Sequence, residues 1–167
     1  MARTKMNRIA LWFVTGMWTG YLRPASGTWG SLPVVVLAVG LATVGADPRR
    51  IDMIVGLIGI IFAIACCVWG SEAETHFGKK DPGTVVADEF AGQALALMWM
   101  PWSHADLQSN LMMGGVAFLT FRVFDVLKPP PAYGWQRFEG GIGILIDDIV
   151  AGLYALASTQ LVVHTLL

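Results

Sequence analysis

Five apolar runs, separated by short polar connections, dominate this sequence and restrict the folds that it can adopt. Hydrophobic residues make up 55% of the 167 residues and charged residues only 14%, whereas a soluble domain carries about 25%. The chain is therefore predicted to be an all-α, polytopic helical membrane protein with about five short transmembrane helices in a single domain, 1–167. A soluble all-α protein that buries these runs against itself is the less favoured alternative. The runs cover residues 31–46, 52–69, 86–102, 107–121 and 145–166.

The first 22 residues favour an N-terminal helix that lies in the membrane interface. Three basic residues precede an apolar segment, as in a signal peptide, but threonines interrupt that segment. Trp12, Trp18 and Tyr21 are of the types that gather at the headgroup level of a bilayer. We therefore expect an interfacial helix rather than a cleaved leader.

The charges of the connections predict which side of the membrane each one faces. With five crossings and a cytoplasmic N-terminus, connections 23–30, 70–85 and 122–144 share the cytoplasmic side and are rich in Lys and Arg. Connection 103–106 lies outside and has none. The arginine pair at 49–50 also falls outside, against the positive-inside bias. The three motif-bearing connections are thus expected on one side.

Charged residues gather between the last two apolar runs, in the segment 121–152. A charge beside hydrocarbon is expensive, so ionisable residues placed there are functional candidates. Arg122, Asp125 and Lys128 follow one another at three-residue intervals, which puts them roughly on one helix face before the prolines at 129–131 end the helix. Carboxylates mixed with cations suit a divalent cation plus a phosphate better than a purely structural ion pair.

Two adjacent aspartates, Asp147 and Asp148, stand in the last apolar run after a glycine-rich stretch. Neighbouring helical residues diverge by about 100°, so one can point into a site and the other toward a second metal or an orienting cation. A structural pair of Arg122 with Asp148 is the alternative for part of this set.

A second acidic pair, Asp88 and Glu89, begins an apolar helix after the turn at 81–83. Adjacent carboxylates repel each other unless a cation is present, and a hard cation with oxygen ligands fits them. The alternative is charge complementarity with the helix N-terminus, which would need only one acid. The pair therefore predicts a metal site.

A third motif, Ser-Gly-Thr-Trp-Gly-Ser at 26–31, lies between two prolines. Its glycines let backbone N–H groups approach a ligand, and its hydroxyls add donors, among them Thr28 and Ser31. A helix is expected to begin near Ser31 or Pro33, where its dipole would favour an anion. An ordinary capped turn is an equally good interpretation of the hexapeptide alone.

Four motifs in this order, GTWGS, DPGTVVADEFAG, FRVFDVLKP and GGIGILIDDIVAG, resemble the phosphatidylglycerophosphatase A family. The resemblance implies a helical, Mg²⁺-dependent lipid phosphatase of the bacterial inner membrane, which hydrolyses phosphatidylglycerophosphate to phosphatidylglycerol and phosphate. Ser26 stands where members of the family often have proline, and Gln136 stands where they often have an acidic residue before the arginine. The implied metal-binding and catalytic residues are Asp88, Glu89, Asp125, Asp147 and Asp148; the implied substrate-binding residues are Thr28, Ser31, Arg122, Lys128 and Arg137.

The expected chemistry is Mg²⁺-assisted hydrolysis of a phosphate monoester on the cytoplasmic face. The attacking group is either water or an aspartate, for which Asp125 is the candidate. The expected partners are the phospholipid substrate and the membrane. Nucleic acid is excluded because the net charge is −1 and no basic, aromatic module occurs. The oligomeric state stays open.

Three other functions are compatible with parts of the pattern. A small transporter could use intramembrane acids as an ion path, but it would need them at the midplane rather than near helix ends. A CDP-alcohol phosphotransferase would also place acids and Mg²⁺ at a membrane surface, but no DGxxAR-like segment occurs. A phosphatase acting on other lipid phosphates keeps the same chemistry with a different substrate.

Overall fold

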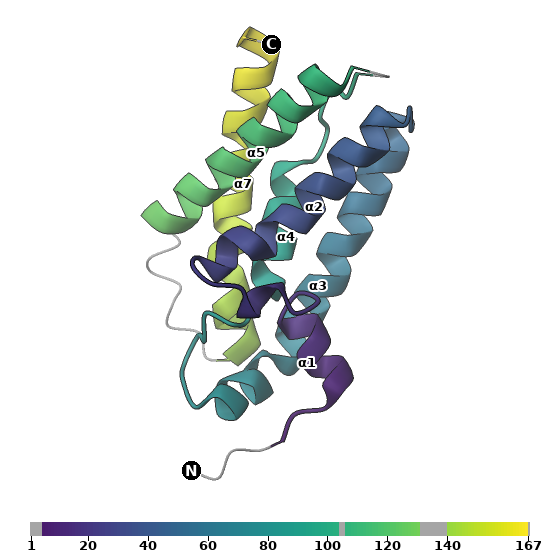
Figure 1. Cartoon of the computed structure of the whole chain (residues 1–167). Helices are drawn as coiled ribbons and strands as arrows, with labels where there is room; N and C mark the ends of the chain where they lie inside the picture. The colour runs from purple at the N-terminus through teal and green to yellow at the C-terminus, as the bar shows by residue number, and fades with distance from the viewer. Residues whose placement is uncertain (1–4, 104–105, 131–139, 167) are drawn as a thin grey trace.

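The structure, a computed structural model, describes residues 5–103, 106–130 and 140–166, and within these ranges it contains helices and no strand (Figure 1). The predicted all-α class is confirmed. The elements in chain order are α1 (Arg8–Val14), the short 3₁₀ helix η1 (Thr19–Tyr21), α2 (Ser26–Thr43), α3 (Pro48–Phe77), α4 (Ala87–Ala96), α5 (Leu107–Leu127) and α7 (Gly140–Leu166).

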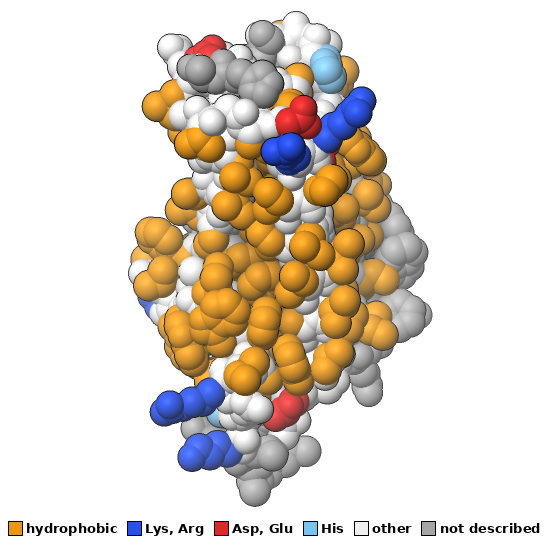
Figure 2. All heavy atoms as spheres, turned by 90° about the vertical axis from the view of Figure 1, so that its right-hand side faces the viewer, with side chains coloured by type: hydrophobic (Ala, Val, Ile, Leu, Met, Phe, Trp, Pro, Cys, Tyr) orange, Lys and Arg blue, Asp and Glu red, His pale blue; other side chains and the backbone are white. Residues whose placement is uncertain are grey.

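Four of the described helices, α2, α3, α5 and α7, are long and apolar enough to cross a membrane. The longest, α3, has 30 residues, which corresponds to about 45 Å against a hydrocarbon thickness of about 30 Å. On the face shown in Figure 2, hydrophobic side chains form a broad band across the middle, and Lys and Arg gather toward its two ends. These features confirm a polytopic helical membrane protein.

The segment 86–102 differs from the expected fifth transmembrane helix. It contains α4, which has only ten residues and is about 15 Å long. Eight of the ten residues are buried, because α4 lies inside the bundle and packs against α3 and α7. An apolar sequence is as typical of a helix buried in protein as of one facing lipid, so composition did not distinguish the two. The described residues therefore contain four candidate spans.

Two glycines let α4 approach α7 closely. A Cβ atom on Gly92 would lie 2.5 Å from the backbone oxygen of Asp148, and one on Gly152 would lie 2.5 Å from the backbone oxygen of Gly92. Neither position has room for a side chain. This contact places the acidic start of α4 beside the aspartates of α7.

The helix ends that carry the sequence motifs lie at the same end of the bundle, the lower one in Figure 1. These are the first turns of α2, α4 and α7 and the last turns of α3 and α5. The expectation that the motif-bearing connections share one side agrees with this arrangement. Helices of alternating direction bring residues more than a hundred positions apart in the chain to one site.

The N-terminal segment packs on the outside of the bundle at the same end. Helix α1 has only seven residues and buries Ala10 and Val14, mainly against α3. Trp18 and Tyr21 remain 46% and 47% exposed. Aromatic side chains with this exposure suit the headgroup region, so the interfacial position stays a prediction that the structure accommodates.

Candidate active site

Helix α2 begins at Ser26, so the prediction of a helix start near Ser31 or Pro33 was wrong. The motif at 26–31 forms the first turns of α2 instead of a loop. Gly27 explains why, since a Cβ there would lie only 2.0 Å from Oε1 of Glu89. The helical backbone at Gly27 packs directly against the acidic side chain, and this contact overrides the weak helix propensity of the motif.

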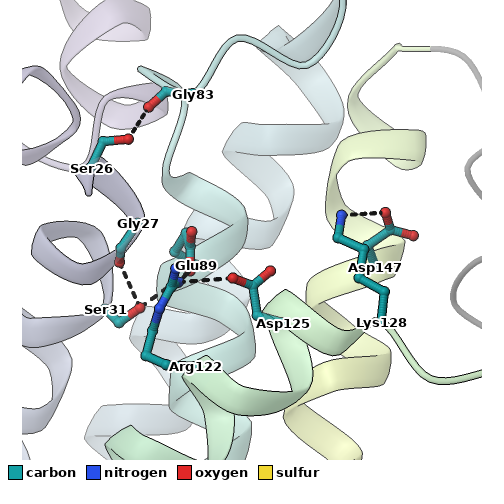
Figure 3. A network of polar contacts seen from close by, with 9 residues as sticks. All are labelled: Ser26, Gly27, Ser31, Gly83, Glu89, Arg122, Asp125, Lys128 and Asp147. Atoms are coloured by element: carbon teal, nitrogen blue, oxygen red, sulfur yellow. Dashed lines mark hydrogen bonds and ion pairs between the residues drawn. The ribbon is translucent and has the colours of Figure 1, made fainter. Parts of the chain in front are cut away.

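Glu89, Arg122 and Asp125 form the centre of the site (Figure 3). The guanidinium of Arg122 donates a hydrogen bond to Glu89, and its Nη1 lies 3.1 Å from Oδ2 of Asp125. The hydroxyl of Ser31 lies 3.2 Å from Oε2 of Glu89 and 2.8 Å from the carbonyl oxygen of Gly27. Three helices, α2, α4 and α5, therefore contribute to one polar network.

A set of three carboxylates within this network could hold a metal ion. Glu89, Asp125 and Asp148 each offer an oxygen, and these oxygens lie within 4.8 Å of one another. Three ionised carboxylates this close together repel one another unless a proton or a cation lies between them. Asp148 is 3% exposed, and its Oδ2 has no hydrogen-bond partner among the described residues. The donor set is of the all-oxygen type that Mg²⁺ prefers.

Asp88 lies beside this set without belonging to it. Its side chain is 8% exposed, and Oδ1 has no hydrogen-bond partner among the described residues. It is close enough to Asp148 for the two charges to interact. A buried carboxylate with an unpartnered oxygen is costly, so Asp88 adds to the demand for a cation at this place.

Lys128 and Asp147 form a separate ion pair next to the carboxylate set, with Nζ 2.9 Å from Oδ2. Lys128 caps α5 in a left-handed conformation (φ 44°), so its side chain leaves the face shared by Arg122 and Asp125 and reaches α7. Burial opposes the charge on Lys128, but the hydrogen bond and the charge of Asp147 raise its pKa above the ordinary value. Lys128 therefore stays cationic at neutral pH.

The two adjacent aspartates of α7 diverge as their spacing on a helix requires. Asp148 points toward Glu89 and Asp125, and Asp147 points toward Lys128. Arg122 forms ion pairs with Glu89 and Asp125. The alternative considered from the sequence, a pair of Arg122 with Asp148, is not among the described ion pairs.

A polar cavity of about 330 Å³ opens beside the ion pair of Lys128 and Asp147. Burial raises the pKa of Asp81, one of its acidic residues, while the charge of Lys128 opposes this shift. The cavity has the polarity and the position to receive a hydrophilic group next to the carboxylates. Its lining comprises Glu74, Lys80, Asp81, Gly140, Gly143, Ile144 and Asp147.

Two predicted substrate-binding residues remain, Thr28 and Arg137. Thr28 is in the first turn of α2, half-buried, and among the described contacts its side chain makes no hydrogen bond to the carboxylates. Arg137 lies outside the described residues.

Three contributors to the site are not among the predicted site residues. Gly27 supplies the close approach of α2 to Glu89, and Ser26 donates a hydrogen bond to the carbonyl of Gly83, which ties α2 to the turn before α4. Lys80 lines the polar cavity. The glycines of the first motif indicated close packing, but the sequence did not show that Glu89 is the side chain that packs against Gly27.

Comparison with known proteins places these features in a family. The sequence model of the family "Phosphatidylglycerophosphatase A" matches residues 12–163. The chain is 34% identical over 155 residues to the phosphatidylglycerophosphatase A of Haemophilus influenzae, covering 90% of this chain and 85% of that protein. It is 28% identical over 164 residues to the phosphatidylglycerophosphatase A of Escherichia coli K12, covering 98% and 88%.

The name of a third relative gives a different substrate. The chain is 29% identical over 141 residues to a Bacteroides thetaiotaomicron protein described, provisionally, as a phosphatidylinositol-3-phosphatase, covering 84% of this chain and 85% of that protein. No solved structure matches the chain significantly.

Proposed function

Since the chain belongs to the phosphatidylglycerophosphatase A family and is a phosphatase, we propose that it hydrolyses phosphatidylglycerophosphate to phosphatidylglycerol and inorganic phosphate. The observation that carries this proposal is the group of three converging carboxylates, Glu89, Asp125 and Asp148, next to the cations Arg122 and Lys128. Phosphoryl transfer requires carboxylates that hold a metal ion and cationic side chains that neutralise the phosphate.

The cofactor in this proposal is Mg²⁺. Glu89, Asp125 and Asp148 would hold it, because their oxygens converge and Oδ2 of Asp148 has no hydrogen-bond partner among the described residues. The bound ion supplies positive charge that offsets the negative charge of the phosphoryl group in the transition state. Asp88 is a further carboxylate whose charge interacts with this set, and Asp147 is engaged by Lys128.

The protein's own residues bind and orient the phosphate. Lys128 and Arg122 neutralise phosphoryl oxygens, and Arg122 can do so while it remains tethered to Asp125 on its own helix. Ser31 holds the carboxylate of Glu89 in its orientation. The bond from phosphorus to the glycerol oxygen breaks, a bond to a new oxygen forms, and the glycerol oxygen takes up a proton. The new oxygen comes from water, directly or after transfer to Asp125.

The site would face the cytoplasm of a bacterial cell from the inner membrane. Arg23, Lys79 and Lys80 lie near the end of the bundle that carries the site, in connections that the positive-inside bias assigns to the cytoplasm. Labelling of Lys79→Cys and Arg49→Cys, at opposite ends of α3, with an impermeant maleimide in intact cells tests this. Labelling of Lys79→Cys alone from outside contradicts the orientation.

The function is tested by phosphate release from phosphatidylglycerophosphate by the detergent-purified protein, with Mg²⁺ added and then chelated by EDTA. Glu89→Gln and Asp125→Asn should each reduce turnover by at least about a hundredfold. The matched control is Asp106→Asn, which changes an exposed acid at the other end of the bundle and keeps an N-cap for α5.

Substrate identity needs a separate arm. Phosphatidic acid and phosphatidylinositol 3-phosphate are assayed beside phosphatidylglycerophosphate, and we expect the last to give the highest kcat/KM. Absence of release from it by a folded, monodisperse sample would refute the proposal. Release that EDTA leaves unchanged would refute the role of Mg²⁺.

A further inference from the structure

An apolar groove with a volume of about 510 Å³ runs between α2 and α5, away from the carboxylates. Only hydrocarbon-rich side chains, glycines and one threonine line it, and several of them are exposed: Val36 is 62% exposed and Val44 is 81% exposed. In a helix pair within the bilayer, such a groove faces lipid. Further lining residues are Val39, Leu107, Leu111 and Phe118.

The groove continues the same helix faces that carry the site. On α2, Ser31 at the carboxylates is followed at four-residue intervals by Val35, Val39 and Thr43, which line the groove. Residues spaced by three or four positions lie on one side of a helix. The first turn of the groove is therefore adjacent to Ser31.

The same holds for α5. Leu111, Gly115 and Phe118 line the groove, and Arg122 follows Phe118 after four residues and contacts Glu89 and Asp125. Along both helices, then, one continuous stripe is polar at the site and apolar beyond it. A molecule that lies along this stripe would have a charged end and an apolar body.

The dimensions of the groove fit one leaflet of a bilayer. Its lining on α2 runs from Leu32 to Val44, and this stretch is about 18 Å long at 1.5 Å per residue. One leaflet has a hydrocarbon depth of about 15 Å. A lipid with its phosphate at Arg122 would thus have an acyl chain of matching reach in the groove.

Glycines shape the floor and the opening of the groove. At Gly114 the helices touch, since a Cβ there would lie 2.6 Å from Cγ2 of Val39. At Gly40 and Gly115, in contrast, no atom lies within 4 Å of a Cβ position. These two positions leave open space along the groove and can be enlarged without a clash between the helices.

From this continuity we propose that the groove between α2 and α5 binds one acyl chain of the phospholipid substrate and so helps to place its phosphate at the carboxylates. The inference rests on the proposed function, because it assigns the occupant as the substrate's own chain. It names Gly40 and Gly115 as positions that determine the tolerance for that chain.

The test compares two substrates in detergent micelles, phosphatidylglycerophosphate with two oleoyl chains and the same lipid with two hexanoyl chains. Gly115→Leu and Gly40→Leu fill the groove. Each should lower kcat/KM for the oleoyl substrate by about tenfold and leave the value for the hexanoyl substrate within about twofold. Ala157→Leu, which adds bulk at an exposed position of α7 outside the groove, should change neither.

Equal losses with both substrates, or no loss with either, would overturn the inference. So would a change from dimer to monomer in Gly115→Leu, measured by light scattering in detergent, since the groove would then be an interface between two copies. Failure of the proposed function looks different: the unmodified protein releases phosphate from neither substrate. In that case, crosslinking by a phosphatidylglycerol with a photoreactive acyl chain still tests the groove, and labelling of α2 and α5 that Gly115→Leu abolishes would support chain binding.

Discussion

Gly27→Ala tests whether the close contact of α2 with α4 positions the carboxylate of Glu89, which we propose to take part in catalysis. The new Cβ would lie 2.0 Å from Oε1 of Glu89 and 2.8 Å from Nη1 of Arg122, whereas real Cβ contacts are essentially never under 3.0 Å. Glu89 or the backbone of α2 must therefore move by at least about 1 Å. The hydrogen bonds of the Glu89 carboxylate with Arg122 and Ser31 oppose this movement.

The expected loss falls on activity more than on stability. Overpacking costs about 1–3 kcal/mol, but alanine replaces glycine in the first turn of a helix and returns at most about 1 kcal/mol. The net change in the free energy of unfolding should stay within about 2 kcal/mol. A displacement of about 1 Å at a reacting group can reduce the rate by about a hundredfold, so kcat/KM should fall by about that factor.

The assay is phosphate release from phosphatidylglycerophosphate, with thermal unfolding in detergent measured by circular dichroism on the same samples. The matched control is Gly56→Ala in α3, where the nearest atom to the new Cβ, Cε of Met98, lies 3.8 Å away, an ordinary contact. Full activity in a folded Gly27→Ala protein would refute the reasoning, because the carboxylate would then not depend on this contact.

Two further predictions follow from the charges around the site. Lys128→Met should lower kcat/KM by about a hundredfold and Lys128→Arg by much less, since we propose that Lys128 neutralises the phosphate beside Asp147; equal losses in both variants would point to a purely structural role. Asp81 has a raised pKa in the folded protein, so it binds a proton more tightly there than in the unfolded chain, and its stabilising effect is lost as pH rises from the ordinary value of 3.8 through the raised one. The unfolding temperature of the unmodified protein should therefore fall relative to that of Asp81→Asn over this rise in pH; a constant difference would contradict the shift.

Local spacing predicted the parts of the site that depend on one helix. Arg122 and Asp125, three residues apart on α5, form an ion pair, and the adjacent Asp147 and Asp148 point toward different partners. Lys128 left the expected face because the helix ends there with a left-handed residue, a detail that its sequence spacing does not contain.

Long-range packing decided what the sequence could not predict. The helix start at Ser26 depends on the contact of Gly27 with Glu89, 62 positions later in the chain. Helix α4 ends at Ala96, shortly before the left-handed Trp99 (φ 58°), and its close approach to α7 at Gly92 and Gly152 again joins segments far apart in the chain. Apolar composition alone is the same for a helix that meets lipid and a helix that meets protein.

The short α4 also offers a physical reason for where the acids lie. Asp88 and Glu89 occupy its first turn, where the helix dipole favours negative charge, and the surrounding helices shield them from hydrocarbon. A full transmembrane helix at this place would have its acidic start at the edge of the bundle. Because α4 begins inside the bundle, Glu89 meets Arg122 and Asp125 on α5 and Asp148 on α7. The feature that departs most from the expectation, a buried helix of ten residues, is thus the one that assembles the carboxylates.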